Sequence, residues 1–389
     1  MQLTFPHLGE AYLYARLLFK ELGVPLTIPP LNSTASLERG SRVSPEEICL
    51  PFKLMAGNLL EAWEAGADTV LMPATMGPCR LGQYGELLQR ILQKEGCRYR
   101  WILLDSPAAI GYRELIRRAD SVLDGRKISG ERIFSALRQV AILVKDFEEV
   151  RRQYRLLCGS YRFRELSASI YREAETLLKT AGDLQSAGAA MQEKRREVRR
   201  IKRSRAEETE RREEVSVLVT GEIYSCIEPF ANHHIADLLE QLNVSFAITP
   251  TIGWWIGRTF HLPGCGAGCK KPPVRGGDSF RKERIPCEIG GYARDTVDSV
   301  LRAADSGFDG VIQIFPSGCM PEIVAKSVFD RTEHSREIPV LSLIFDEMGG
   351  EAGYITRVEA FADLLQRKRD AVCRGNIQRK GDRHGVFRH

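Results

Sequence analysis

"GFDGVIQIFPSGCMPEIVAKSVF" (residues 307–329) combines the signals that decide the fold. A run of apolar residues ends at Pro316 and is typical of a short buried strand. A Ser-Gly turn and Cys319 follow, and Pro321 then suits the first turn of a helix. A strand followed by a loop and a helix is the repeating unit of parallel α/β proteins, so the stretch predicts one such unit with Cys319 in its loop.

The chain contains this pattern twice. Residues 66–92, "GADTVLMPATMGPCRLGQYGELLQRIL", repeat the order of Gly-x-Asp, apolar strand, proline, cysteine loop and helix. Residues 7–30 and 219–250 form a second pair, each with a Gly-Glu turn, an amphipathic helix and a strand that ends in proline. Strands in "RYRWILLDS" and "IPVLSLIFDE" close the two halves. The sequence therefore predicts an α/β protein with two similar parallel-sheet domains of flavodoxin-like or Rossmann-like type, joined by a helical connector.

The predicted boundaries follow from this repeat. Residues 1–150 form the first α/β domain, residues 215–375 the second, and residues 151–214 a long, mostly helical connector. Acids interrupt the basic cluster at residues 194–205, and it has no aromatic partners, so we interpret it as a solvated helix face rather than a phosphate-binding surface. Residues 376–389 are expected to be a disordered tail.

Composition limits the class of protein. The 389 residues are 43% hydrophobic and 28% charged, with a formal net charge of +5, so we expect neither a nucleic-acid partner nor a membrane partner. The N-terminus lacks a basic segment followed by an apolar one, which indicates no signal peptide and predicts a cytoplasmic protein. In that reducing compartment the ten cysteines are expected to be buried thiols or metal ligands rather than disulfides.

Three cysteines occupy positions suited to ligand binding. In "SPEEICLPFK" (44–53), Ser44 and Glu47 form a predicted capping box, which places Cys49 near a helix N-terminus. Cys79 and Cys319 each follow a predicted strand and precede a predicted helix. Ligands of open α/β sheets bind beyond the carboxyl ends of strands, and helix N-termini favour thiolates.

Three further cysteines extend this set. Cys287 precedes its Gly-x-Asp strand much as Cys49 precedes the equivalent strand, and "GCGAGC" (264–269) adds Cys265 and Cys269 in a glycine-rich loop. Thiolate sites select zinc or iron-sulfur clusters. Only Cys265 and Cys269 have the spacing of a structural zinc site, so ligands scattered over both domains favour an iron-sulfur cluster. The remaining cysteines are expected to be small buried hydrophobes: Cys97, Cys158, Cys226 and Cys373.

The segments that carry these cysteines also resemble a known superfamily. "EICLPFK" (47–53), "GPCRLGQYGE" (77–86) and "FPSGCMPEIVA" (315–325), followed by residues 338–365, are similar to the 2-hydroxyacyl-CoA dehydratase and benzoyl-CoA reductase superfamily. The similarity is greatest to its CoA-activase-related and double-cubane cluster proteins. The resemblance covers both α/β domains. It implies that an ATP-hydrolysing iron-sulfur activator passes low-potential electrons to a cysteine-held cluster on this type of protein, which then performs a difficult reduction or a reductive dehydration.

The resemblance implies roles for individual residues. Cys49, Cys79 and Cys319 match the cluster ligands of the superfamily. A double-cubane [8Fe-9S] cluster takes six cysteines, and the candidates for the second three are Cys265, Cys269 and Cys287. Relatives carry Gly-Gly-His-Gly where this chain has "GGYARDT" (290–296).

The expected function follows from the resemblance. We expect an oxygen-sensitive reductase that forms a homodimer through its long connector helices. Glu322 is a candidate catalytic group that exchanges a proton near the cluster, or else it stabilises a helix N-terminus. The chain has no Gly-x4-Gly-Lys-Ser/Thr loop, so a separate activator is expected to hydrolyse ATP. Two alternatives remain: a 2-hydroxyacyl-CoA dehydratase-like subunit with one [4Fe-4S] cluster, and a zinc-stabilised scaffold that binds RNA through its connector.

Two polar segments are predicted to be structural. The loop 346–351 contains three acids, but the capping box formed by Thr356 and Glu359 indicates a strand-to-helix connection there. His233 and His234 are adjacent on a predicted helix, so their side chains are expected to point in different directions and not to bind one metal ion.

Overall fold

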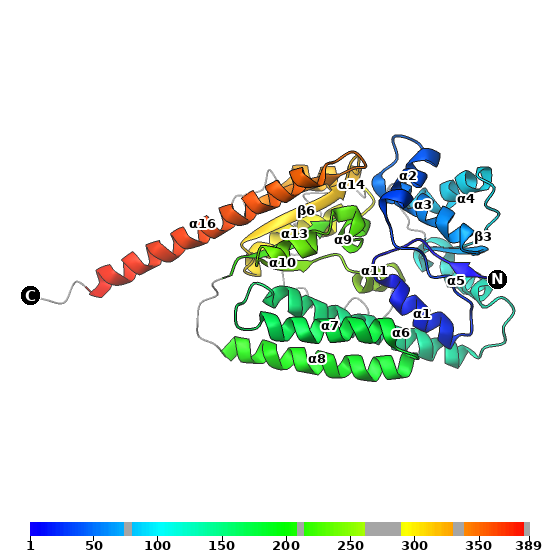
Figure 1. Cartoon of the computed structure of the whole chain (residues 1–389), viewed down its shortest axis with the longest axis horizontal. Coiled ribbons are helices and arrows are strands. Elements are labelled where there is room, and N and C mark those ends of the chain that lie inside the picture. Colours follow the sequence, from blue (N-terminus) through cyan, green and yellow to red (C-terminus); the bar gives the residue numbers. More distant parts are fainter. Residues whose placement is uncertain (74–79, 208–213, 261–288, 330–337, 385–389) are drawn as a thin grey trace, which may run out of the picture.

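The computed structural model describes residues 1–73, 80–207, 214–260, 289–329 and 338–384. The described residues form two parallel-sheet α/β units and a bundle of long helices (Figure 1). The first unit contains the blue and cyan elements, the second contains the yellow sheet, and the green bundle lies along both. The predicted α/β class with two parallel sheets is confirmed.

The first unit has a parallel sheet with the strand order β1-β2-β3. Leu26 forms an isolated parallel bridge to Leu3 on the side of β1 away from β2. The elements of this unit are β1 (Leu3–Thr4), α1 (Ala11–Glu21), α2 (Thr34–Val43), α3 (Leu50–Glu64), β2 (Thr69–Pro73), the 3-10 helix η1 (Arg80–Gln83), α4 (Tyr84–Lys94), β3 (Arg100–Leu104) and α5 (Pro107–Leu123).

The second unit has a parallel sheet with the order β5-β4-β6-β7. Strand β6 is buried at every residue, as expected for an apolar run in the middle of a sheet. The elements are β4 (Ser216–Gly221), α9 (Ile223–Ile227), the 3-10 helix η2 (Phe230–Asn232), α10 (Ile235–Gln241), β5 (Ser245–Ile248), α11 (Ile252–Phe260), α13 (Ala293–Asp305), β6 (Gly310–Pro316), α14 (Met320–Phe329), β7 (Val340–Phe345) and α16 (Glu351–His384).

The two sheets have the same topology. The Leu26 bridge, β1, β2 and β3 correspond in order to β5, β4, β6 and β7. Both units place a helix between the second and third members of this series, α3 in one and α13 in the other. The internal repeat seen in the sequence is thus a repeat of the fold, although the strand expected after α1 is reduced to a single bridge.

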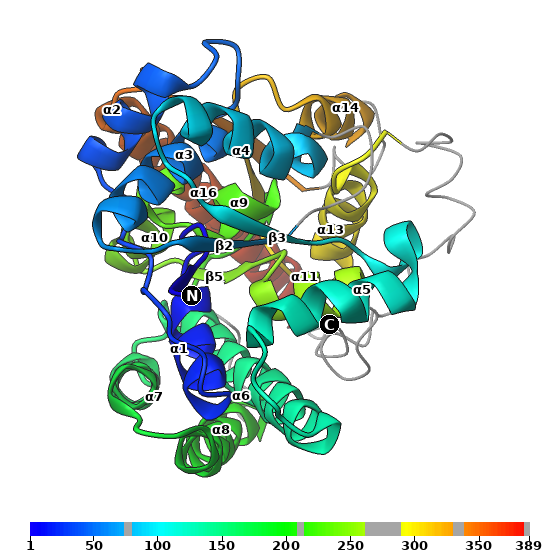
Figure 2. The same cartoon turned by 90° about the vertical axis from the view of Figure 1, so that its right-hand side faces the viewer.

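The connector is a bundle of three long helices, α6 (Gly130–Leu157), α7 (Arg164–Thr180) and α8 (Leu184–Glu207). Figure 2 shows this bundle below the first unit, next to α1. Helix α6 is continuous across residue 150, where the first domain was predicted to end. Within the basic cluster, Lys194 pairs with Glu173 and Glu197.

Helix α3 is buried along most of its length because apolar residues occupy most of its positions. It crosses α2 so closely that a Cβ atom on Gly40 would lie 1.7 Å from the Lys53 carbonyl oxygen. Only glycine permits this approach. The same core contains residues of α3 and residues of the second sheet, such as Leu54 and Ile314, so the two units share one hydrophobic core.

Helix α16 begins after β7 and extends away from the second sheet toward the C-terminus (Figure 1). It continues to His384, so residues 376–384 of the predicted disordered tail are helical, and residues 385–389 lie outside the described part. Thr356 lies inside this helix and donates to the Ala352 carbonyl, so the capping box predicted there was wrong. Among the described helices, none is both long and apolar enough to cross a lipid bilayer.

Candidate functional site

Cys49 is the N-cap residue of α3. Its carbonyl accepts from the Phe52 amide at 3.0 Å, and Pro51 occupies the first turn of the helix. The predicted position near a helix N-terminus is present, but the predicted capping box is not, because α2 ends at Val43 and Ser44 is its C-cap. The start of α3 follows the run of four apolar residues around Pro51 and not the capping box predicted at Ser44.

The Cys49 thiol is half-buried, and its Sγ lies 2.5 Å from the Oη of Tyr84. Tyr84 is buried, begins α4, and packs edge-on against Phe52 of α3 with ring centroids 5.0 Å apart. The phenol therefore holds the thiol at the start of two helices.

Cys319 occupies the equivalent kind of position in the second unit. It follows β6 and immediately precedes α14, its amide donates to the Pro316 carbonyl at 3.1 Å, and its carbonyl accepts from Ile323 at 3.0 Å. The side chain is half-buried. Like Cys49, it lies where the unpaired amides of a helix N-terminus favour a thiolate.

An ion pair connects the segments that carry these two cysteines. Lys53, in the first turn of α3, is 3% exposed and pairs with Glu347, which follows β7 in the other unit. The Lys53 ammonium also donates to the Glu46 carbonyl at 3.0 Å. The Ser317 amide donates to the Phe345 carbonyl at 2.7 Å, so the loop with Glu347 is bonded to the loop with Cys319.

A second polar contact joins the units beside β1. His7 is 3% exposed, and its Nδ1 lies 2.7 Å from Oε2 of the buried Glu228 at the end of α9. The Gly9 amide donates to the same oxygen at 2.9 Å. Sequence reasoning missed His7, Glu228 and Lys53. For Lys53 the available signal was a lysine inside an otherwise apolar helix.

Glu322 is buried in the first turn of α14, three residues after Cys319. Thr296 donates to its Oε1 at 2.9 Å, and Gln313 donates to its Oε2 at 3.0 Å. Burial raises the pKa of the Glu322 carboxyl to about 7 against the opposing effect of these two hydrogen bonds, and the nearby carboxyls of Glu222 and Asp295 raise it further. The group can therefore hold or release a proton near neutral pH.

The other described cysteines with placed side chains differ from Cys49 and Cys319. Cys97, Cys158 and Cys226 are buried, as predicted. Burial raises the pKa of each thiol, to about 12 for Cys158, whose Sγ donates to the Val244 carbonyl at 3.0 Å. Low thiolate content makes these three cysteines poor ligands in their observed surroundings.

The remaining cysteine candidates lie outside the described residues: Cys79, Cys265, Cys269 and Cys287. In the described part of the chain, no group of three or more His, Cys, Asp or Glu side chains is placed to hold a metal ion. What the structure establishes for the candidate ligands is therefore the placement of Cys49 and Cys319.

His233 and His234 were predicted to lie on a helix, but that prediction was wrong. They lie between η2 and α10 and have left-handed backbone angles. The His233 ring stacks on Tyr354 at 4.8 Å between centroids, whereas Nδ1 of the exposed His234 lies 3.5 Å from Asp237. The two side chains therefore have different partners.

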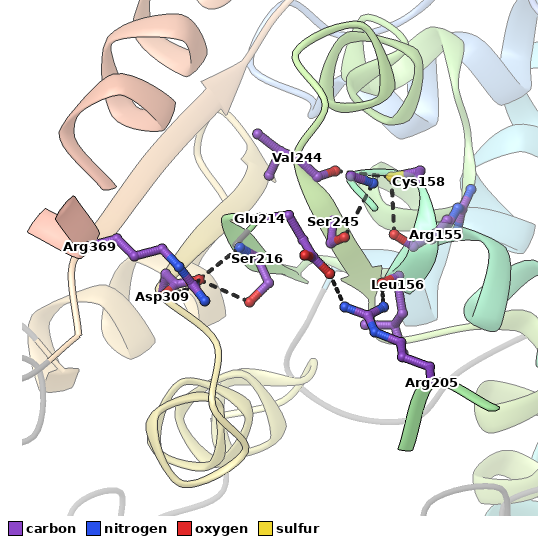
Figure 3. A network of polar contacts seen from close by, with 11 residues as sticks. Arg155, Leu156, Cys158, Arg205, Glu214, Ser216, Val244, Ser245, Asp309 and Arg369 are labelled. Atoms are coloured by element: carbon purple, nitrogen blue, oxygen red, sulfur yellow. Dashed lines mark hydrogen bonds and ion pairs between the residues drawn. The ribbon is translucent and has the colours of Figure 1, made fainter. Parts of the chain in front are cut away.

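An open groove of about 1190 Å³ lies at the opposite end of the second sheet, next to the amino ends of β4 and β5. Figure 3 shows the contacts beside it: Arg205 of α8 pairs with Glu214, and Asp309 accepts from Ser216 and pairs with Arg369. These contacts connect α8 and α16 to the sheet. Ligands of parallel sheets bind at the carboxyl ends of strands. We therefore locate the candidate site at that end of the sheet, next to Cys319.

Comparisons with known proteins give no family. No family model matches the chain, and no curated protein matches it. One similar solved structure is a "Putative sugar binding protein" from Salmonella typhimurium, with 9% sequence identity, a TM-score of 0.19, and coverage of 94% of this chain and 88% of the other. A likeness this weak carries no argument about fold or function.

Proposed function

We propose that this protein is the iron-sulfur component of a reductase, with a double-cubane-type [8Fe-9S] cluster held between its two α/β units. It accepts low-potential electrons from a separate ATP-hydrolysing activator and reduces a small substrate. The observation that carries the proposal is the placement of Cys49 and Cys319. Each cysteine immediately precedes a helix, and the Lys53–Glu347 ion pair connects their segments across the interface between the units.

The donor chemistry fits such a group. Both thiols are half-buried at helix N-termini, which stabilise thiolates and an anionic cluster. The superfamily resemblance assigns Cys79 to the same set, and Cys265, Cys269 and Cys287 complete six ligands. A bound cluster supplies one-electron transfer at a low potential, which its burial and hydrogen bonds adjust.

One of the chain's own residues can supply a proton. Glu322, with its pKa near 7, takes up or releases the proton that accompanies electron transfer to a substrate. Thr296 and Gln313 fix both of its carboxyl oxygens, and Ser342 donates to the Gln313 amide oxygen at 2.9 Å, which orients that amide. Glu322 is the catalytic residue that we propose.

The proposal includes partners and a compartment. The sequence contains no Gly-x4-Gly-Lys-Ser/Thr motif, which supports a separate ATP-dependent activator. A homodimer and a cytoplasmic location complete the proposal. Light scattering of the purified protein tests the dimer.

The test is the content of iron, acid-labile sulfide and zinc in protein purified without oxygen. About eight irons per chain support the double cubane, and about four support a single [4Fe-4S] cluster of the dehydratase type. Zinc without iron refutes both. Cys49→Ala and Cys319→Ala should each lower the iron content, whereas Cys158→Ala, a change at a buried cysteine, should not.

A further inference from the structure

Lys53 is an unusual residue for its position. It is 3% exposed in the first turn of a helix that is otherwise mostly apolar. Burial of an ammonium group is costly, and the positive end of a helix dipole adds to that cost. Its retention there requires compensating partners.

Those partners come from both sides of the interface. The Glu46 carbonyl belongs to the segment that leads into Cys49, whereas Glu347 belongs to the second unit. Lys53 follows Cys49 by four residues, so the two lie on the same side of the start of α3. Glu347 lies two residues after Phe345, whose carbonyl is bonded to the Cys319 loop.

We propose that Lys53 and Glu347 are positioning residues that fix the separation between Cys49 and Cys319 before any cluster binds. The ion pair is a polar contact that joins the Cys49 segment to the loops at the carboxyl ends of the strands of the second sheet. The role of the ion pair in cluster binding rests on the proposed function, whereas its effect on the distance between Cys49 and Cys319 does not.

Loss of this ion pair need not separate the units as a whole. His7 and Glu228 form another buried contact between them, and the shared core includes residues from both. Removal of the Lys53 ammonium should therefore act locally, on the distance between the two cysteines. Removal of Glu347 should act in the same way. Its side chain is 30% exposed, so this change leaves no charge deeply buried on the Glu347 side and is the milder test of folding.

The test uses cluster-free full-length protein and a short bifunctional maleimide, with the Cys49–Cys319 cross-linked peptides quantified by mass spectrometry. Lys53→Met and Glu347→Gln should each lower the cross-linked yield by about tenfold, which corresponds to about 1.4 kcal/mol. Lys53→Arg and the charge exchange Lys53→Glu with Glu347→Lys should restore much of the yield. Circular dichroism checks that each variant is folded.

The matched control is Arg195→Met. Arg195 pairs with Asp146, which is 1% exposed, inside the helical bundle, so this variant also loses a partly buried ion pair but leaves the interface intact. Its cross-linked yield should equal that of the wild type. An equal yield in folded Glu347→Gln would overturn the inference.

Iron analysis separates this inference from the proposed function. A wild-type protein without iron refutes the function, yet the cross-linking result still decides the role of the ion pair. Iron in the wild type together with reduced cross-linking and reduced iron in Glu347→Gln supports both. Unchanged cross-linking with normal iron refutes only the positioning role.

Discussion

Glu322→Gln should change how the stability of the protein depends on pH. The Glu322 carboxyl is 1% exposed and has a pKa of about 7 in the folded chain, against an ordinary value of 4.5. Below the ordinary value the carboxyl is protonated in both folded and unfolded chains. As the pH rises, the unfolded chain loses this proton first, so the wild type loses stability until the folded carboxyl also ionises near pH 7.

The size of the effect follows from the two pKa values. One pKa unit corresponds to 1.36 kcal/mol, so the wild type should lose about 3 kcal/mol between about pH 4.5 and pH 7 through this one group. Glutamine keeps the shape of the side chain and cannot ionise. The free energy of unfolding of Glu322→Gln should therefore exceed that of the wild type by an amount that grows over this interval and is constant above it.

Urea unfolding of the cluster-free proteins at a series of pH values measures this difference. Glu359→Gln, a change at an exposed glutamate of α16, is the control and should follow the wild type throughout. Parallel curves for Glu322→Gln and the wild type would refute the argument, because they would show that the folded carboxyl ionises as it does in the unfolded chain.

Gly9→Ala should destabilise the protein by about 3 kcal/mol or more, because Gly9 has a φ of +50° and an added Cβ would lie 2.2 Å from the Ile227 carbonyl oxygen of the second unit. Gly23→Ala, at a φ of +64° with open space around the Cβ position, should cost only about 1 kcal/mol, and equal losses in thermal unfolding would contradict this account. Iodoacetamide should alkylate the half-buried Cys49 well before Cys158, whose thiol has a pKa of about 12, and peptide mapping of a time course would expose the reverse order.

The sequence predicted the arrangement of strands well because that information is local. Apolar runs such as that of β6 identify buried strands, and their repetition with the same flanking residues predicted two sheets, which the structure shows with matching strand order. The loop position of Cys319 followed directly from the strand and the proline beside it.

The errors arose where two local signals competed or where contacts were distant in the chain. Ser44 and Thr356 both had a glutamate three residues later, but Ser44 is the C-cap of α2 and Thr356 lies inside α16, which begins at Glu351. The carboxylate partners of Lys53 and His7 lie more than 200 residues away, so no local pattern could indicate them.

For the proposed function, the shared hydrophobic core has a consequence for electron transfer. Leu54 and Leu59 of the first unit pack in the same core as Ile314 and Phe345 of the second, so a wide hinge opening would expose apolar surface to water. The interface is thus expected to remain closed through a catalytic cycle. A stiff protein environment moves little when an electron arrives, which keeps the reorganisation energy small. Because the interface stays closed, the activator and the substrate would have to reach the site from its rim.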